Sequence, residues 1–542
     1  MRADHRTPPS RPRRPRRALA LALAATLLLG LPACGGDDAD GDGGAGGAGK
    51  TPPGVVLEDG RGKDSIKLDP AQASDGESSK VIDNVYETLV DFSWDPATPT
   101  AIVPRLATSW KESEDRRSWT FELRPGVVFH DGTPFDSAAV VATFEHLLAK
   151  DAGERPYRGN FLDVEAVEAS GPGRVVFRLK EPSAVLLRNL AMFCASIVSP
   201  KALKKHGEAL ASHPVGTGPF KLLRWQKDQV VVLQRFERWW GKERGNLDVV
   251  VFKQIKDWAS RREQLKSGEI QMTDDLVFQD VDELRATPGV EVQITDGMNV
   301  CYLTMNREKA PFDDARTRKA VAMAIDRDRI VELGYYGQAV PARDMLPPNI
   351  PFHTGTVAPA HDPQAAEDLF VASGARGLEV ELCVMNNPRP YLMQPDLVGQ
   401  IIKDSLAKAG LEVRIVKLDW ATYLARLQRG EYQMAIIGWS TDNGDPDNFY
   451  TPLLSSGSID GTNYSRFSDT NFDVLLAEAR QVTDEARRGE LFARMQAILA
   501  EDCPTVPLVH TRIGSAFRDD VTGFIRHPIK IRLERTSRTT PR

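Results

Sequence analysis

The apolar pattern between residues 377 and 449 constrains the fold more than any other feature of this 542-residue chain. It predicts, in order, a strand over 378–385, a helix over 397–406, a strand over 411–415, a helix over 423–427 and a strand over 434–437. Gly410 and Gly430 stand where each helix is expected to stop. Alternation of strand and helix implies parallel strands joined by right-handed crossovers. The sequence therefore predicts an α/β fold.

Polar loops follow the first and third of these strands. One contains Arg389 and Tyr391, and the other spans residues 439–448. Open parallel sheets bind ligands outside the carboxyl ends of their strands. We therefore expect both loops to lie on the same edge of one lobe.

The residue types in these loops suit a small zwitterion. Arg389 offers a planar fork for a carboxylate, and Asp442 offers a counter-charge for an ammonium group. Tyr391 and Trp439 offer flat apolar walls, each with one polar group. The alternative is that Arg389 and Asp442 are solvated loop charges or pair with each other, and spacing alone favours that alternative.

The motifs disfavour an enzyme, such as a secreted hydrolase. The chain has no GxSxG elbow, no HExxH, no Walker loop and no GxGxxG after a strand. His130 has no second histidine nearby, so a turn or capping role is favoured. Residues 216–220 (GTGPF) predict a structural turn, and residues 442–447 lack the final glutamate of a calcium loop. We expect a binding protein with no cofactor and no metal.

The length and the net charge of the chain further narrow the possible classes of protein. Domains usually contain about 100–200 residues, so this length predicts two to four packed units. The net charge of −6 gives no basic surface for nucleic acid. In the first half, alternation predicts a strand over 118–123, and turn residues on both sides indicate a second strand over 127–129. Asp136 can cap a helix that runs to residue 148.

The N-terminus has the pattern of an export signal. A basic block at 11–17 precedes an apolar stretch at 18–31, which is too short to span a bilayer, for which about 20 residues are needed. The stretch leads into residues 31–34 (LPAC), which end at Cys34 and resemble a bacterial lipobox. Residues 35–54 are rich in glycine and aspartate and predict a flexible tether. Export permits disulfides, but the cysteines of the body are widely spaced and predict buried thiols.

Longer motifs identify a family. The chain resembles the family 5 extracellular solute-binding proteins, the peptide and nickel group of ABC importers, over nearly all of residues 55–535. The resemblance is carried by 85–90 (VYETLV), 104–110 (PRLATSW), 123–135 (LRPGVVFHDGTPF), 216–220 (GTGPF), 311–316 (PFDDAR) and 324–327 (AIDR).

Within that family the chain is most similar to dipeptide-binding proteins, through residues 387–391 (NPRPY) and 438–449 (GWSTDNGDPDNF). The resemblance implies that Arg389 holds the peptide carboxylate and Asp442 the α-ammonium group. The expected ligand-binding residues are Arg389, Tyr391, Trp439, Asp442 and Asn443. The Ser-Thr pair at 440–441 departs from the usual Thr-Gly, a difference that affects the fine shape of the pocket.

The resemblance also implies an architecture. We expect a two-lobed, type II periplasmic-binding-protein-like fold with an inserted subdomain and a ligand cleft between the lobes. The expected segments are a signal peptide (1–33), a lipidated Cys34 with its stalk (34–54), lobe I (55–294, insert about 85–215), lobe II (295–510) and a return to lobe I (511–542).

The expected function is that of an extracytoplasmic lipoprotein, anchored to the membrane by lipid, that captures dipeptides or short peptides. Expected partners are the peptide, the ABC permease and its ATPases; the protein is expected to be a monomer. Open alternatives are an oligopeptide, glutathione, haem or a nickel chelate on the same scaffold, and a chaperone-like or signalling receptor without a transporter.

Overall fold

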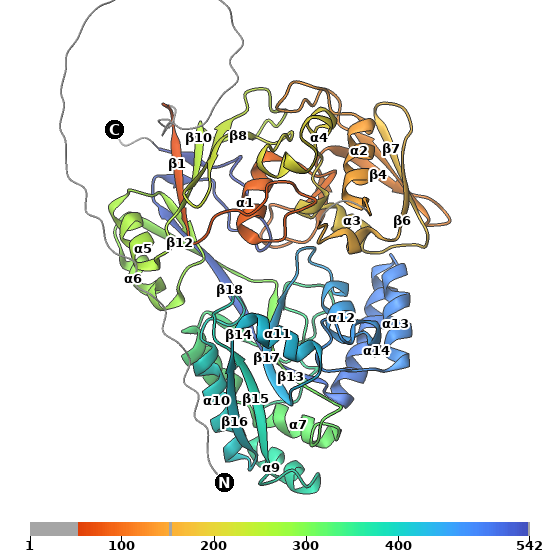
Figure 1. Cartoon of the computed structure of the whole chain (residues 1–542), viewed down its shortest axis with the longest axis vertical. Helices are drawn as coiled ribbons and strands as arrows, with labels where there is room; N and C mark the ends of the chain where they lie inside the picture. The colour runs from red at the N-terminus through yellow and green to blue at the C-terminus, as the bar shows by residue number, and fades with distance from the viewer. Residues whose placement is uncertain (1–52, 151–153, 540–542) are drawn as a thin grey trace, which may run out of the picture. The chain divides into compact units, whose positions relative to one another are not determined.

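The computed structural model describes residues 53–150 and 154–539. The expected signal peptide (1–33), Cys34 and nearly all of the stalk (34–54) lie outside the described residues. Strands and helices are interspersed along the described chain, so the predicted α/β fold is confirmed (Figure 1). None of the helices in these residues has both the length and the apolar character that crossing a membrane requires.

One large sheet organises the described residues and has twelve strands within them. Its order is β16 (Glu412–Leu418), β15 (Glu379–Met385), β17 (Met434–Ser440), β13 (Asn299–Met305), β18 (Thr505–Arg518), β11 (Met272–Asp274), β1 (Val56–Arg61), β10 (Val249–Gln254), β9 (Val230–Arg235) and β8 (Phe220–Gln226). Two more strands, β12 (Val290–Asp296) and β14 (Ala339–Pro341), pair with β18.

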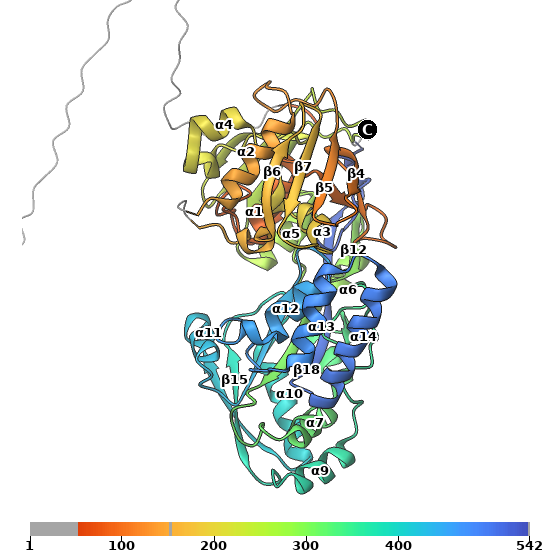
Figure 2. The ribbon, with the colours of Figure 1, turned by 90° about the vertical axis from the view of Figure 1, so that its right-hand side faces the viewer.

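The helices occupy the connections between strands. In chain order they are α1 (Gly76–Val85), α2 (Ser137–Leu148), α3 (Leu186–Leu190), α4 (Pro200–His206), α5 (Trp258–Ser267), α6 (Val281–Ala286), α7 (Ala315–Ala324), α8 (Arg327–Arg329), α9 (Pro363–Ala372), α10 (Pro395–Lys408), α11 (Trp420–Gln428), α12 (Asp447–Leu454), α13 (Thr470–Gln481) and α14 (Glu485–Asp502). Figure 2 shows α13 and α14 side by side.

The predicted unit at 377–449 is confirmed element by element as β15, α10, β16, α11 and β17. β15 pairs in parallel with both β16 and β17. Gly410, with φ +96°, follows the end of α10 in the left-handed region that favours glycine. The carboxyl ends of these strands therefore meet at one edge, which places the two loops expected to carry the site.

Strand β18 connects the two halves of the large sheet. Its first part pairs with β13 and β14, and its second part pairs with β11 and β12. The strand does not stop with its apolar residues before position 510 but continues to Arg518. The second part of β18 has no continuous apolar pattern. It is a strand because β11 and β12 pair with it on both sides.

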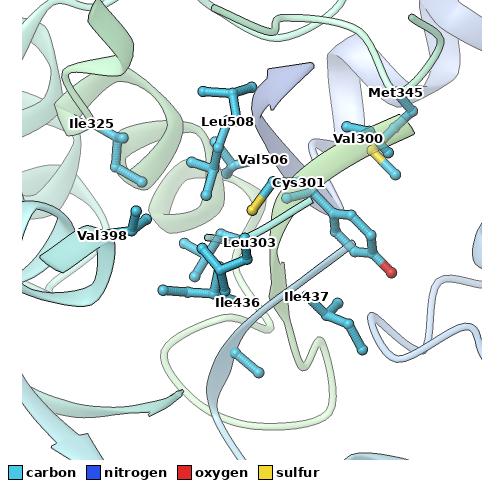
Figure 3. Close-up of a cluster of buried hydrophobic side chains, with 14 of the residues drawn as sticks. Val300, Cys301, Leu303, Ile325, Met345, Val398, Ile436, Ile437, Val506 and Leu508 are labelled. Atoms are coloured by element: carbon cyan, nitrogen blue, oxygen red, sulfur yellow. The ribbon is translucent and has the colours of Figure 1, made fainter. Parts of the chain in front are cut away.

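Two large apolar cores lie in different parts of the sequence. One is built mostly from residues between 265 and 516, and Figure 3 shows β13, β17 and β18 contributing Leu303, Ile436 and Val506 to it. The other draws mainly on residues 57–252 and on the C-terminal residues 517–533. The described cysteines (Cys194, Cys301, Cys383, Cys503) are buried free thiols, as predicted.

A separate four-stranded sheet belongs to the first half. Its order is β4 (Ala107–Glu112), β5 (Ser118–Leu123), β7 (Arg174–Leu179) and β6 (Val164–Ala169). Helix α2 packs on β6 and β7 and is capped by the Asp136 carboxylate, as predicted (Figure 2). Shorter two-stranded sheets pair β2 (Val90–Phe92) with β3 (Ile102–Pro104), and β19 (Val521–Thr522) with β20 (Ser537–Arg538).

The predicted strand at 127–129 is wrong. This segment makes a single bridge, between Val128 and Pro134, and Phe129 donates its N–H to the Thr133 carbonyl. A turn through Gly132, at φ +81°, takes the place of a ladder. Three apolar residues in a row are too few to specify a strand against such a turn.

Candidate ligand-binding site

The two polar loops meet at the edge of the sheet, as predicted. Arg389, Tyr391 and Trp439 line one cavity of about 390 Å³, which we call the aromatic cavity. Its other lining residues are Tyr302, Pro390, Trp420, Leu424, Ile437, Gly438, Ser440 and Tyr464. A mostly apolar wall with one guanidinium group suits a small organic ligand that carries an anionic end.

Arg389 is held in place but its charge is not neutralised. It sits in a tight turn in which Arg389 and Leu392 exchange backbone hydrogen bonds of 3.0 and 2.8 Å. Its Cζ lies 3.8 Å from the ring centroid of Trp420, a cation–π contact. Its Nε–H is buried and lacks a hydrogen-bond partner among the described residues, where the side chain also forms no ion pair. The fork is therefore free to bind a carboxylate.

Tyr391 forms one wall of the cavity by packing on Gly438. A Cβ atom at Gly438 would lie 2.3 Å from Cδ2 of Tyr391, so only glycine allows this approach. The Tyr335 hydroxyl donates a 2.8 Å hydrogen bond to the Tyr391 carbonyl and so fixes the loop that carries Tyr391. Trp439 is half-buried, and its Nε1–H donates to Asn448 Oδ1 at 3.2 Å. Both rings are thus oriented by the protein before any ligand arrives.

Asp442 lies beyond the lining of the aromatic cavity and faces the first half of the chain. Its Oδ2 accepts a 2.9 Å hydrogen bond from the Tyr157 hydroxyl. The Tyr157 ring packs edge-on against Phe193, with centroids 5.1 Å apart. Burial raises the pKa of Asp442, and the Tyr157 hydrogen bond opposes that rise. The carboxylate forms no ion pair within the described residues, so it does not pair with Arg389.

Asn443 belongs to the protein's own hydrogen-bond network. Its Nδ2 donates to Asn189 Oδ1 at 2.8 Å. Its Oδ1 accepts from the Thr441 hydroxyl at 3.0 Å and from the Asp445 N–H at 2.9 Å. Asn443 is buried and does not line the aromatic cavity. These contacts shape the loop that carries Asp442.

Asp445 anchors the same loop through arginines. Arg488 donates two hydrogen bonds to its carboxylate, at 2.9 and 2.6 Å, and Arg188 lies 3.3 Å away. These cations neutralise the Asp445 carboxylate, in a segment for which the sequence already disfavoured a calcium loop. The aspartate-rich run therefore serves loop structure.

His130 also has a structural role, as favoured from the sequence. Its Nε2 lies 3.0 Å from the Gly218 carbonyl and its backbone N–H donates to the Gly216 carbonyl. Burial lowers the pKa of His130 to about 4, so the ring is neutral at physiological pH. The GTGPF segment is the turn that this histidine ties down.

A second cavity of about 240 Å³ adjoins the first and shares Arg389 with it. We call it the arginine cavity. Its lining residues are Asp275, Leu276, Phe278, Pro388, Arg389, Pro390, Met393, Arg512, Ile513, Gly514 and Arg526.

Sequence analysis missed three residues next to the predicted site: Tyr157, Trp420 and Arg526. Trp420 begins α11 directly after β16, whose carboxyl end lies at the same sheet edge, so the strand-end rule would have found it. Tyr157 and Arg526 come from distant segments and carried no such signal.

Known proteins match this chain over most of its length. Residues 101–461 match the family model described as bacterial extracellular solute-binding proteins, family 5 middle. Di/tripeptide-binding protein 1 of Pseudomonas aeruginosa is 32% identical over 481 residues, covering 84% of this chain and 89% of that protein. Heme-binding protein A of Haemophilus influenzae is 33% identical over 471 residues, covering 82% and 85%.

A solved structure agrees with both the fold and the family. The dipeptide binding protein from Pseudoalteromonas sp. SM9913, in complex with Met-Leu, matches with a TM-score of 0.76 and 27% identity, covering 89% of this chain and all (100%) of that one. The predicted periplasmic-binding-protein-like fold is confirmed by this match. The chain belongs to family 5 of the bacterial extracellular solute-binding proteins, a class of binding proteins and not of enzymes.

Proposed function

We propose that this protein captures dipeptides or similarly short peptides outside the cytoplasm and delivers them to the membrane permease of an ABC importer. One observation carries the proposal. An arginine and an aspartate, each without an ion-pair partner among the described residues, come from neighbouring loops beside an aromatic cavity. The names of the P. aeruginosa and Pseudoalteromonas relatives support the same ligand class.

The two charged groups would select a ligand that has both ends. Arg389 would hold the carboxylate, and Asp442 would hold the ammonium group with Tyr157 beside it. Burying an ion is costly unless it meets a fixed partner, so a peptide lacking either charge would leave one buried group uncompensated. Tyr391 and Trp439 would flank the peptide, and the space of the aromatic cavity would take its side chains.

Lobe closure would couple binding to delivery. We place lobe I at 55–294 with its insert at about 85–215, lobe II at 295–510, and the return to lobe I at 511–542. The two apolar cores follow most of this division, but residues 265–290 of lobe I pack in the same core as lobe II. The β12–β13 passage and β18 would form the connections. A ligand that contacts both lobes favours the closed form by its differential affinity.

A ligand panel tests the proposed function. Calorimetry should show tight binding of Ala-Leu and far weaker binding of an octapeptide, glutathione or a nickel–histidine chelate. Small-angle scattering should show a smaller radius of gyration with Ala-Leu. Haem is the competing candidate because the H. influenzae relative bears that name; tight haem binding with a shifted Soret band, and no binding of Ala-Leu, would overturn the proposal.

The N-terminus would anchor the receptor to the membrane. We propose removal of residues 1–33, lipidation of Cys34 and a tether through residue 54. Mass spectrometry of the mature protein is expected to show a diacylated Cys34 as its first residue, and Cys34→Ser should release the protein from membranes. A mature N-terminus at any other residue would contradict this.

A further inference from the structure

Two guanidinium groups without ion-pair partners line the arginine cavity. Neither Arg389 nor Arg526 forms an ion pair within the described residues, and the Nε–H of each is buried there without a hydrogen-bond partner. Arg512 lines the same cavity but is paired, because its Nε lies 3.2 Å from Asp296 Oδ1. The acid in the lining, Asp275, lies 3.3 Å from Lys80 Nζ. The cavity therefore holds two guanidinium groups that make no direct ion pair within the described residues, although the carboxylates of Asp274, Asp275 and Asp59 lie near Arg526.

Arg526 is fixed by its backbone and its neighbours. It lies beyond the end of β18, and its N–H donates to Gln293 Oε1 at 3.0 Å. One terminal nitrogen donates to the His527 carbonyl at 2.6 Å. Burial lowers the pKa of Arg526, and the nearby carboxylates of Asp274, Asp275 and Asp59 act in the opposite direction and raise it. The guanidinium group of Arg526 thus stays charged and fixed in position, and its Nε–H makes no hydrogen bond within the described residues.

We propose that Arg526 is a second carboxylate-binding residue and that the ligand's C-terminal carboxylate lies in the arginine cavity, in contact with both Arg389 and Arg526. This inference rests on the proposed function, since it assumes a ligand with a free carboxylate. Two guanidinium forks can satisfy both carboxylate oxygens at once. The rest of the ligand then occupies the aromatic cavity, which shares Arg389 and Pro390.

The arrangement gives the carboxylate a role in closure. Arg389 follows β15, whereas Arg526 belongs to the C-terminal segment that packs with the other apolar core. A carboxylate held by both would join the two lobes directly. A ligand without it would lose affinity and also the means of stabilising the closed form.

The test compares Ala-Leu with Ala-Leu amide, which has the same shape but no carboxylate. Calorimetry on Arg526→Gln is expected to show about a tenfold loss for the acid and less than a twofold loss for the amide. Arg526→Lys keeps a charge and should recover part of the loss. Thermal unfolding of each variant, with and without ligand, separates binding from folding.

Arg429→Gln is the control, since Arg429 lies outside both cavities, is exposed and already pairs with Glu431 at 2.9 Å; its loss for the acid should stay below threefold. Equal losses of acid and amide in Arg526→Gln would overturn the assignment, as would an equal effect of Arg429→Gln. If Arg389→Ala alone removes the preference for the acid, the proposed function stands and the role of Arg526 fails. If the wild-type protein does not distinguish acid from amide, both fail.

Discussion

Arg389→Ala is expected to weaken the binding of Ala-Leu about 100-fold or more, which corresponds to about 2.7 kcal/mol. The guanidinium is half-buried, stacked on Trp420 and without an ion-pair partner among the described residues. In the variant, a bound carboxylate would therefore lose its main counter-charge. Isothermal titration calorimetry measures the loss directly.

Arg389→Lys tests the contribution of the positive charge separately from that of the planar guanidinium geometry. Lysine keeps the positive charge but cannot make two parallel hydrogen bonds, so its affinity should fall between those of wild type and alanine. Arg429→Ala is the control in the same half of the chain, because Arg429 is exposed and pairs with Glu431 at 2.9 Å. Its affinity should change less than twofold. Unchanged binding in Arg389→Ala would remove the basis of the zwitterion hypothesis.

Local patterns were sufficient to predict the part of the fold that carries the site. β15, α10, β16, α11 and β17 are short elements with apolar faces and glycine stops, and each follows from residues within about ten positions. The position of Arg389 and Trp439 at one sheet edge then follows from strand direction alone. No alignment of distant segments was needed.

Contacts between distant segments could not be predicted. Tyr157 and Asp442 are separated by 285 positions, and nothing in the residues around Tyr157 marks it as a partner of that carboxylate. Arg526 reaches its cavity only because β18 carries the chain from one core to the other. The same strand continues beyond residue 510 because β11 and β12 pair with it, a tertiary effect without a local signal.

Asp442→Asn is expected to weaken the binding of Ala-Leu about 30-fold, or about 2 kcal/mol, and to leave N-acetyl-Ala-Leu almost unaffected. Asparagine keeps the shape and can still accept the hydrogen bond from Tyr157, so the loss reports the charge. Tyr157→Phe is the matched control; it keeps the charge of Asp442 and removes one hydrogen bond to that carboxylate, worth about 1.5–3 kcal/mol. A variant that still prefers the free ammonium group would show that Asp442 is not its partner.

The pH dependence of peptide affinity gives an independent test of the pairing between Asp442 and the ligand's ammonium group. Burial raises the pKa of Asp442, and the protonated acid has no charge to offer an ammonium group. Affinity of the wild-type protein should therefore fall on acidification at a pH above the ordinary range of an aspartate. Burial also raises the pKa of Tyr157 and of Cys194, so both neighbours stay neutral through that range. In Asp442→Asn the acid loss should be absent because the titrating carboxylate is gone. The wild-type alkaline loss, which follows deprotonation of the peptide ammonium group near pH 8, should be much smaller in this variant because it no longer recognises that charge.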